Sequence, residues 1–228
     1  MSGSPTLTIG ITGHRPNRMF LGAKEIARRL LLVLASIRSG TGGGVRLVAL
    51  SALAEGSDRL FAESALALGY QLEVILPFTS ADYETTFGDT MAIPHFRELL
   101  GRAANVTELS GRLEDRTGAY EAAGQMTVSG SDILVTVWDG QAAAGRGGTP
   151  EIIEHAMKLG KPVIWIHAAH IRLPRLIVYS KASGAPPSDL ERIAPRAKPL
   201  TRRRLATLAA LLSEAAAEPS VAGAERAH

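Results

Sequence analysis

The residues ILVTVWDGQAAAGRGGTPE, at positions 133–151, join an apolar run to a glycine-rich loop and then to the start of a helix. A nearly continuous run of Ile, Val and Leu is typical of a strand that is buried on both faces, as in a parallel sheet. Thr149 suits the residue that caps a helix, and Pro150 suits its first position. Capping does not explain the three glycines of the loop, whereas exposed amides at a helix start are suited to bind a phosphate.

Alternating strand and helix patterns continue on both sides of this stretch. Strands are predicted at residues 7–12, 45–50, 72–76, 106–109, 133–138 and 163–167, and helices at 23–39, 58–68, 91–103, 120–129 and 150–159. Gly40, Gly69 and Gly160 follow three of these helices, where a left-handed residue is expected. This order predicts an α/β fold with a doubly wound, mainly parallel sheet of about six to seven strands and helices on both faces. In such a Rossmann-like fold, ligands bind at the carboxyl ends of the strands.

The composition is close to the average of soluble globular proteins, with 228 residues, 46% hydrophobic, 21% charged and no cysteine. These values exclude disordered, fibrous and disulfide-built classes. Residues 1–171 carry 15 basic and 17 acidic residues, whereas residues 172–228 carry 10 and 5. We therefore expect a Rossmann-like domain over residues 1–171 and a Pro-rich basic extension over residues 172–228, which ends in a short helix at 202–217.

The N-terminal residues lack a basic segment that leads into a long apolar stretch, and the longest apolar run covers only residues 30–35. A membrane span needs about 20 residues, so we expect a cytoplasmic protein with no span in these residues. The net charge of −2 over residues 1–171 argues against a uniformly basic nucleic-acid-binding face. The arginine triplet at 202–204 leaves nucleic acid open, although a solvated helix start also explains it.

The segment TGHRP, residues 12–16, follows the first predicted strand. It contains no GxGxxG fingerprint. Gly13 lets the backbone approach a ligand, Arg15 could fork onto a phosphate, and His14 could act as a donor or an acid. In the alternative interpretation, Arg15 pairs with a surface carboxylate and His14 caps the strand end.

The segment SALAEGSD, residues 51–58, follows the second predicted strand and opens directly into a helix. Gly56 allows a tight turn there, and the amides at the helix start form an anion site. Ser51, Glu55, Gly56 and Asp58 are therefore candidate ligand-binding residues. Capping of the helix by Ser57 and Asp58 is the alternative.

Polar residues beside the glycine-rich loop are further candidates. Asp139 and Glu151 could hold ribose hydroxyls, and Glu151 could orient a water molecule. Charged loop residues are more often simply solvated, which is the alternative for both. The candidate phosphate-binding residues of the loop are Gly145, Gly147, Gly148 and Thr149.

Aromatic residues after the third strand offer a surface for a base. Tyr83 is the candidate that we expect to be exposed, whereas Phe78 and Phe87 have the spacing of core residues. Tyr120 and Gly124, on the helix before the fifth strand, indicate either a site wall or close helix packing.

The segment at residues 51–58 resembles the pattern Ser-Gly-x-Ala-x-Gly-Ile-Asp of the DNA-processing branch of the SLOG superfamily of Rossmann-like domains. Ser51, Ala54, Gly56 and Asp58 match this pattern, while positions 52 and 57 depart from it. The segment GGTPE, residues 147–151, resembles the loop Pro-Gly-Gly-x-Gly-Thr-x-Glu-Glu of the lonely-guy branch. The Arg-Lys pair that hydrolases of that branch carry on the preceding helix falls on an alanine and a glycine here, at positions 123–124.

With TGHRP and the WDG of residues 138–140, these motifs look most like the uncharacterised bacterial SLOG proteins of signalling and conflict systems. The resemblance implies a domain that binds a nucleotide or nucleotide-derived messenger, with the phosphate on residues 145–151, and a homodimer or higher oligomer. Two alternatives stay open: an N-glycosidic-bond hydrolase with Glu151 as the catalytic residue, and a single-stranded DNA-binding protein. The six histidines predict no metal site, which leaves Mg²⁺ that enters with the ligand phosphates.

Overall fold

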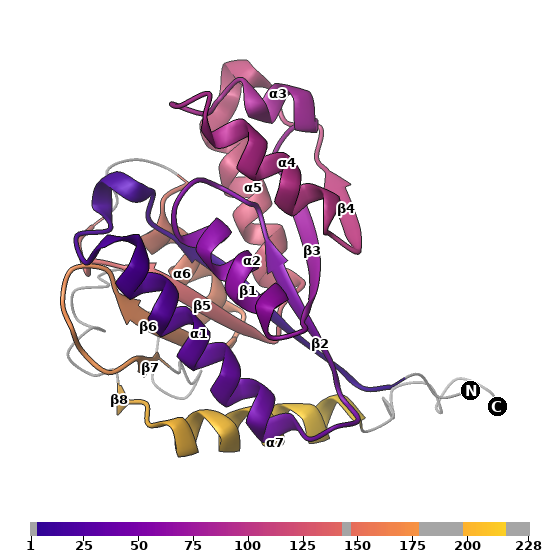
Figure 1. Cartoon of the computed structure of the whole chain (residues 1–228), viewed down its shortest axis with the longest axis vertical. Coiled ribbons are helices and arrows are strands. Elements are labelled where there is room, and N and C mark those ends of the chain that lie inside the picture. The colour runs from indigo at the N-terminus through magenta and orange to yellow at the C-terminus, as the bar shows by residue number, and fades with distance from the viewer. Residues whose placement is uncertain (1–3, 143–146, 178–197, 218–228) are drawn as a thin grey trace.

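The computed structural model describes residues 4–142, 147–177 and 198–217. They form an eight-stranded sheet in the order β4-β3-β2-β1-β5-β6-β7-β8 (Figure 1). The strands are β1 (Thr6–Gly13), β2 (Arg46–Ser51), β3 (Gln71–Leu76), β4 (Asn105–Glu108), β5 (Ile133–Trp138), β6 (Val163–His167), β7 (Arg175–Ile177) and β8 (Lys198–Pro199). All pairs among β1 to β6 are parallel, whereas β7 and β8 are added antiparallel. The predicted α/β class with a mainly parallel sheet is confirmed.

The helices cover both faces of the sheet. Helices α1, α2 and α7 pack on one face, and α5 and α6 on the other (Figure 1). The helices are α1 (Gly22–Thr41), α2 (Ser57–Ala67), α3 (Ser80–Glu84), α4 (Ala92–Gly101), α5 (Arg116–Ser129), α6 (Thr149–Lys158) and α7 (Arg202–Ala217), with short 3-10 turns η1 (Pro16–Arg18) and η2 (Leu113–Asp115). None of the helices in the described ranges is long and apolar enough to cross a bilayer.

Strand β5 shows why its sequence is apolar throughout. Ile133, Val135 and Val137 pack into the core beneath α1 and α2, whereas Leu134 and Trp138 face α6 on the other side. All six residues of the strand are buried. A strand between two helical layers has no solvent face, so the usual alternation of apolar and polar residues is lost.

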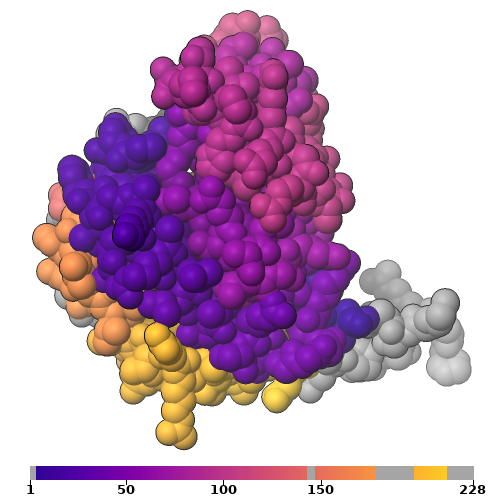
Figure 2. Space-filling model, viewed as in Figure 1, coloured from indigo at the N-terminus to yellow at the C-terminus, as the bar shows by residue number. Residues whose placement is uncertain are grey.

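The C-terminal elements continue the sheet and the core. Strand β7 pairs with β6, and α7 lies along α1, as the yellow surface beside α1 shows (Figure 2). Leu200, Leu205 and Ala209 are buried in the same cluster as the residues of β1. The described residues beyond the predicted boundary at residue 171 therefore pack against the Rossmann-like part. For the segments that form β7 and β8, the sequence pattern predicts only irregular or extended chain.

The contact between α1 and α7 depends on a glycine. A Cβ on Gly40 would lie 2.1 Å from the backbone oxygen of Ala206, so only glycine allows the two helices to approach this closely. The prediction that Gly40 ends α1 in a left-handed conformation is wrong, because α1 continues to Thr41 and Gly42 has the positive φ of +70°. Gly69 and Gly160 have positive φ after their helices, as predicted.

Candidate functional site

A cleft of about 350 Å³ opens where β1, β2 and β3 end, beside α5 and the start of α6. Because β2 and β5 lie on opposite sides of β1, the chain leaves this point over opposite faces of the sheet, which makes it the topological switch point where such folds bind ligands. We call the part near β5 and α6 the β5 end; it includes His14, Arg18 and residues 147–150. We call the part after β2 and β3 the β3 end; it is lined by Ala52, Ala54, Asp58, Pro77, Tyr83 and Tyr120.

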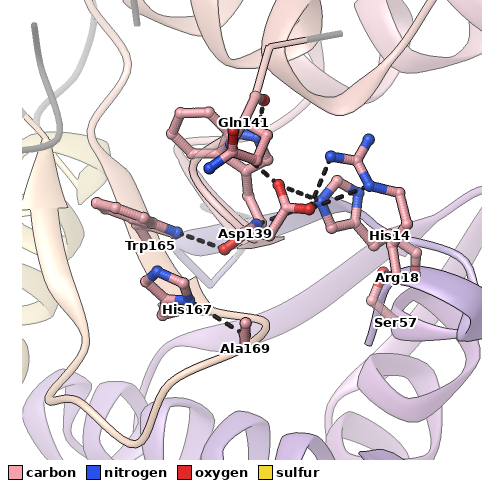
Figure 3. A network of polar contacts seen from close by, with 9 residues as sticks. His14, Arg18, Ser57, Asp139, Gln141, Trp165, His167 and Ala169 are labelled. Carbon is pink, nitrogen blue, oxygen red and sulfur yellow. Dashed lines mark hydrogen bonds and ion pairs between the residues drawn. The ribbon is translucent and has the colours of Figure 1, made fainter. Parts of the chain in front are cut away.

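Several hydrogen-bond donors surround the carboxylate of Asp139 beside the β5 end (Figure 3). Its Oδ2 accepts hydrogen bonds from Nε and an Nη of Arg18 at 3.1 and 2.7 Å, and its Oδ1 accepts from the backbone N–H of Gln141 at 3.0 Å. The Nε2 of His14 lies 3.0 Å from Oδ1. Burial alone would raise the pKa of Asp139, but the hydrogen bonds from His14, Gln141 and Arg18 outweigh it, so the pKa lies below its ordinary value. Asp139 is therefore a carboxylate already paired within the chain.

His14 is held in place from both sides and is 5% exposed. Its backbone oxygen accepts hydrogen bonds from the N–H and the hydroxyl of Ser57, at 3.2 and 3.1 Å. The backbone N–H of Asp139 lies 3.2 Å from the same Nε2 that faces the carboxylate. Burial lowers the pKa of His14 more than Asp139 raises it, so the ring is neutral near pH 7. A neutral imidazole has one N–H, so Nε2 either donates to the carboxylate or accepts from the amide.

Gly13 lies where the parts of the site meet. A Cβ at this position would come within 2.5 Å of the Ser57 hydroxyl oxygen and 2.9 Å of the backbone oxygen of Val137. Glycine thus lets β1 end directly between the start of α2 and the end of β5. This close approach brings His14 to Asp139.

The start of α6 closes the β5 end. Gly148 is the residue before the helix, and Thr149 is its first residue, so the predicted cap is displaced by one position. Gly147 has a φ of +75° and donates its N–H to the Glu151 carboxylate. Gly147, Gly148 and Thr149 line the cleft, whereas Glu151 is not among its described lining residues. Gly145 and Arg146 lie outside the described residues.

At the β3 end, Asp58 is a buried carboxyl, with 6% of the residue exposed. Burial raises its pKa to about 7, and this effect exceeds the opposing contributions of the Ala54 amide, Arg15, Ser57 and Arg59. The Ser57 hydroxyl is 3.5 Å from Oδ1, which is the limit of a hydrogen bond. The pKa of Asp58 is therefore shifted upward, whereas the pKa of Asp139 is shifted downward.

The other candidates after β2 lie behind the wall of the cleft. The Ser51 hydroxyl is fully buried; it donates to the backbone oxygen of Asp58 and accepts from the Leu53 N–H. Gly56, with a φ of +100°, packs against the backbone of residues 14–16. Glu55 forms an ion pair with Arg15 at 3.4 Å. Neither Ser51, Glu55 nor Gly56 is among the described residues that line the cleft.

Tyr83 differs from the expectation. Only 1% of it is exposed, because α3 turns the ring into a cluster with Phe78, Phe87 and Phe96. The prediction that it is exposed is wrong, although its side chain still lines the cleft. Tyr120 lies beside this cluster, and the guanidinium of Arg15 lies 5.7 Å from its ring centre.

The structure adds residues that the motifs did not single out. Arg18 enters through η1, and Thr127 enters from α5. Gly124 lines the cleft and also packs closely, since a Cβ there would lie 2.6 Å from Ile152 Cδ1. Both interpretations of Gly124 are therefore correct. Within the described ranges, no three His, Asp or Glu side chains gather as metal ligands.

No family model and no curated protein matches this sequence. The likeness to known proteins lies in the fold. The X-ray structure of DNA processing protein A from Streptococcus pneumoniae aligns with a TM-score of 0.53 at 14% identity, over 90% of this chain and 61% of that one. This chain has the Rossmann-like fold of DNA processing protein A. The fold implied by the resemblance of residues 51–58 to the DNA-processing branch is thereby confirmed.

Two further solved structures are similar over shorter stretches. The structural genomics target TM1055 gives a TM-score of 0.44 at 16% identity, over 69% of this chain and 72% of that one. DNA processing protein A from Helicobacter pylori, described with a single-stranded DNA binding mode, gives 0.46 at 17%, over 71% and 65%. This chain thus spans less than two thirds of the length of either DNA processing protein.

Proposed function

We propose that this protein binds a nucleotide or nucleotide-derived ligand in the cleft at the carboxyl ends of β1 to β3. The observation that carries the proposal is the division of this cleft into two chemically different ends at the topological switch point. Its volume of about 350 Å³ lies in the range of small-molecule sites. A nucleotide has a matching division into an anionic phosphate and a flat aromatic base.

The phosphate belongs at the β5 end. The N–H groups of Gly148 and Thr149 stand at the start of α6, where the helix dipole favours an anion. Arg18 is 30% exposed at its side chain, and its guanidinium has five N–H donors, of which Asp139 occupies two. Arg18 can therefore donate to a phosphate while Asp139 holds it in position. Mg²⁺ bound to the phosphates would add to this attraction.

The sugar and base then extend toward the β3 end. Ala52, Ala54 and Pro77 offer apolar surface there, and Tyr120 offers an aromatic ring. Glu151 has a bracing role in this proposal, because its carboxylate accepts from the Gly147 N–H and fixes the turn that precedes α6. We therefore favour ligand binding over the glycosidic-bond hydrolase that depends on Glu151.

Isothermal titration calorimetry on the full chain with Arg18→Ala tests this assignment. Guanosine, adenosine, cytidine and uridine monophosphates serve as probes, with and without Mg²⁺. We expect at least one to bind, and Arg18→Ala to weaken it by about tenfold or more, since a hydrogen bond to a charged group contributes about 1.5–3 kcal/mol. Arg28→Ala is the matched control, because Arg28 is an exposed arginine that pairs with Glu25 on α1.

Loss of the Arg18 charge has a second readout. This charge contributes to the low pKa of His14, so we expect the His14 pKa, measured by NMR, to rise in Arg18→Ala and to stay unchanged in Arg28→Ala. Absence of binding by every probe, or equal affinity in the two variants, contradicts the proposal. Tighter binding of a single-stranded oligonucleotide than of any mononucleotide would favour the DNA-binding alternative.

A further inference from the structure

Asp58 is the one carboxylate among the described residues that line the cleft. It lies at the β3 end, in the first turn of α2, among apolar groups from the β2 and β3 ends. A buried carboxylate in such surroundings is costly unless it is paired with donors. The pairing that Asp58 has within the chain is therefore the starting point.

The donors around Asp58 fill only part of the capacity of its carboxylate to accept hydrogen bonds. The Ala54 amide contributes a hydrogen bond, and the Ser57 hydroxyl, which already donates to the backbone oxygen of His14, lies 3.5 Å from Oδ1, whereas a carboxylate can accept about four hydrogen bonds. The hydrogen bonds of the two nearby arginines go to other groups: Arg15 donates to Glu55, and Arg59 donates through Nε and Nη1 to the backbone oxygens of Leu53 and Ala92, while its Nη2 has no partner among the described residues. Burial raises the pKa of Asp58 to about 7, because these few donors do not offset the loss of solvent.

Asp58 lines the part of the cleft where the proposed function places the base, so donors on the base could supply the missing hydrogen bonds. Two neighbouring N–H groups on the edge of a flat heterocycle match the two oxygens of a carboxylate. Guanine carries such a pair, its ring N1–H and its exocyclic amino group. Adenine instead places a bare ring nitrogen beside its amino group, and that nitrogen would meet the carboxylate with a lone pair. An unpaired polar edge in a buried site is strongly rejected.

We propose that Asp58 makes this a guanine-selective site, by accepting hydrogen bonds from the N1–H and the 2-amino group of the base. This inference rests on the proposed nucleotide site and specifies its ligand class. Tyr120 and Pro77 then bound the ring, and the phosphate remains at the β5 end. Hypoxanthine, which retains N1–H but lacks the 2-amino group, binds with intermediate affinity.

The test compares four monophosphates, of guanosine, inosine, adenosine and xanthosine, on the wild-type chain and on Asp58→Asn. We expect the wild-type chain to bind the guanosine form about tenfold more tightly than the adenosine form, with the inosine form between them. In Asp58→Asn, the amide nitrogen would donate to the 2-oxo group of xanthine, while the amide oxygen still accepts from N1–H. The variant should therefore prefer the xanthosine form over the guanosine form.

Asp89→Asn is the matched control, because Asp89 is an exposed aspartate that accepts from the Met91 N–H and lies outside the cleft. It should keep the guanosine preference. Equal wild-type affinity for the guanosine and adenosine forms, or an unchanged preference in a folded Asp58→Asn, overturns the inference and leaves the nucleotide site standing. Absence of binding by all four forms removes the nucleotide site itself. If Asp58→Asn does not fold, the wild-type series alone decides between these outcomes.

Discussion

Asp58 lines the β3 end of the cleft, whereas Asp139 lies beside the β5 end and is not among the described lining residues, and the two carboxyl groups differ in how they are paired. Asp139, beside the β5 end, accepts from Arg18 and the Gln141 amide and lies 3.0 Å from the Nε2 of His14, and its pKa lies below the ordinary value. Asp58, at the β3 end, has few donors, and burial raises its pKa to about 7. Both are almost fully buried, so exposure does not distinguish them. The difference lies in the donors that the fold supplies, which are several for Asp139 and few for Asp58.

The largest loss of stability is expected where the two ends meet, at Gly13. The Cβ added by Gly13→Ala would press on Ser57, which begins α2, and on Val137, which belongs to β5. Overpacking of this kind costs about 1–3 kcal/mol, and we expect the upper part of that range because one of the atoms met is backbone. Urea denaturation measures the loss. Gly88→Ala, at a glycine with open space around it, is the control and should change stability little.

Asp58→Asn tests the β3 end through the pH dependence of stability. The unfolded carboxyl titrates near 3.8 and the folded one near 7, so the folded state keeps its proton while the unfolded state loses it. Stability of the wild-type chain is therefore lost as the pH rises from about 4 to 7. The variant does not titrate, and relative to wild type it should gain on the order of 4 kcal/mol between pH 4 and pH 8, because each unit of pKa shift corresponds to about 1.4 kcal/mol. An unchanged difference across this range would show that Asp58 is already ionised in the folded state.

Asp139→Asn should have the opposite sign and the smallest effect. A carboxylate with a lowered pKa stabilises the folded state above its unfolded pKa, and this contribution is lost as the pH falls. The variant should thus be less stable than wild type at pH 8, by about 1–2 kcal/mol for the weakened bonds to Arg18 and His14. Thermal unfolding at pH 8 and pH 4 measures the difference, which should shrink at pH 4. A more stable variant at pH 8 would contradict the contrast between the two ends.

The sequence predicts the part of the fold that has a strong pattern. The inner strands β1, β2, β3, β5 and β6 are apolar enough to be recognised, because they are largely buried between helices, whereas the edge strand β4 is mostly exposed. Strands β7 and β8 have only three and two residues and lie in a Pro-rich segment, so no periodicity reveals them. Their pairing is set by the edge of β6, which is a tertiary contact and not a local signal.

The candidate site was predicted to a similar extent. Strand ends and glycine turns point to Gly13, His14, Asp58 and the start of α6, and all of these line the cleft, while their binding of a ligand stays a prediction. Arg18 was missed because its pairing with Asp139 joins residues 121 positions apart. Tyr83 was misjudged because a single turn of helix, α3, decides whether its ring faces solvent or Phe96. Local patterns locate the edge of the sheet where chemistry occurs, whereas the partners of each side chain come from long-range packing.

Strand β7 also has a bearing on how the protein can be shortened for expression. It occupies the outer edge of β6, whose residues VIWIH are mostly apolar and buried. An uncovered strand of this kind pairs readily with other chains and promotes aggregation. A chain cut after residue 171 would expose this edge and would also remove Leu205 and Ala209 from the core. The smallest unit that keeps this edge paired and this part of the core filled therefore includes β7 and α7.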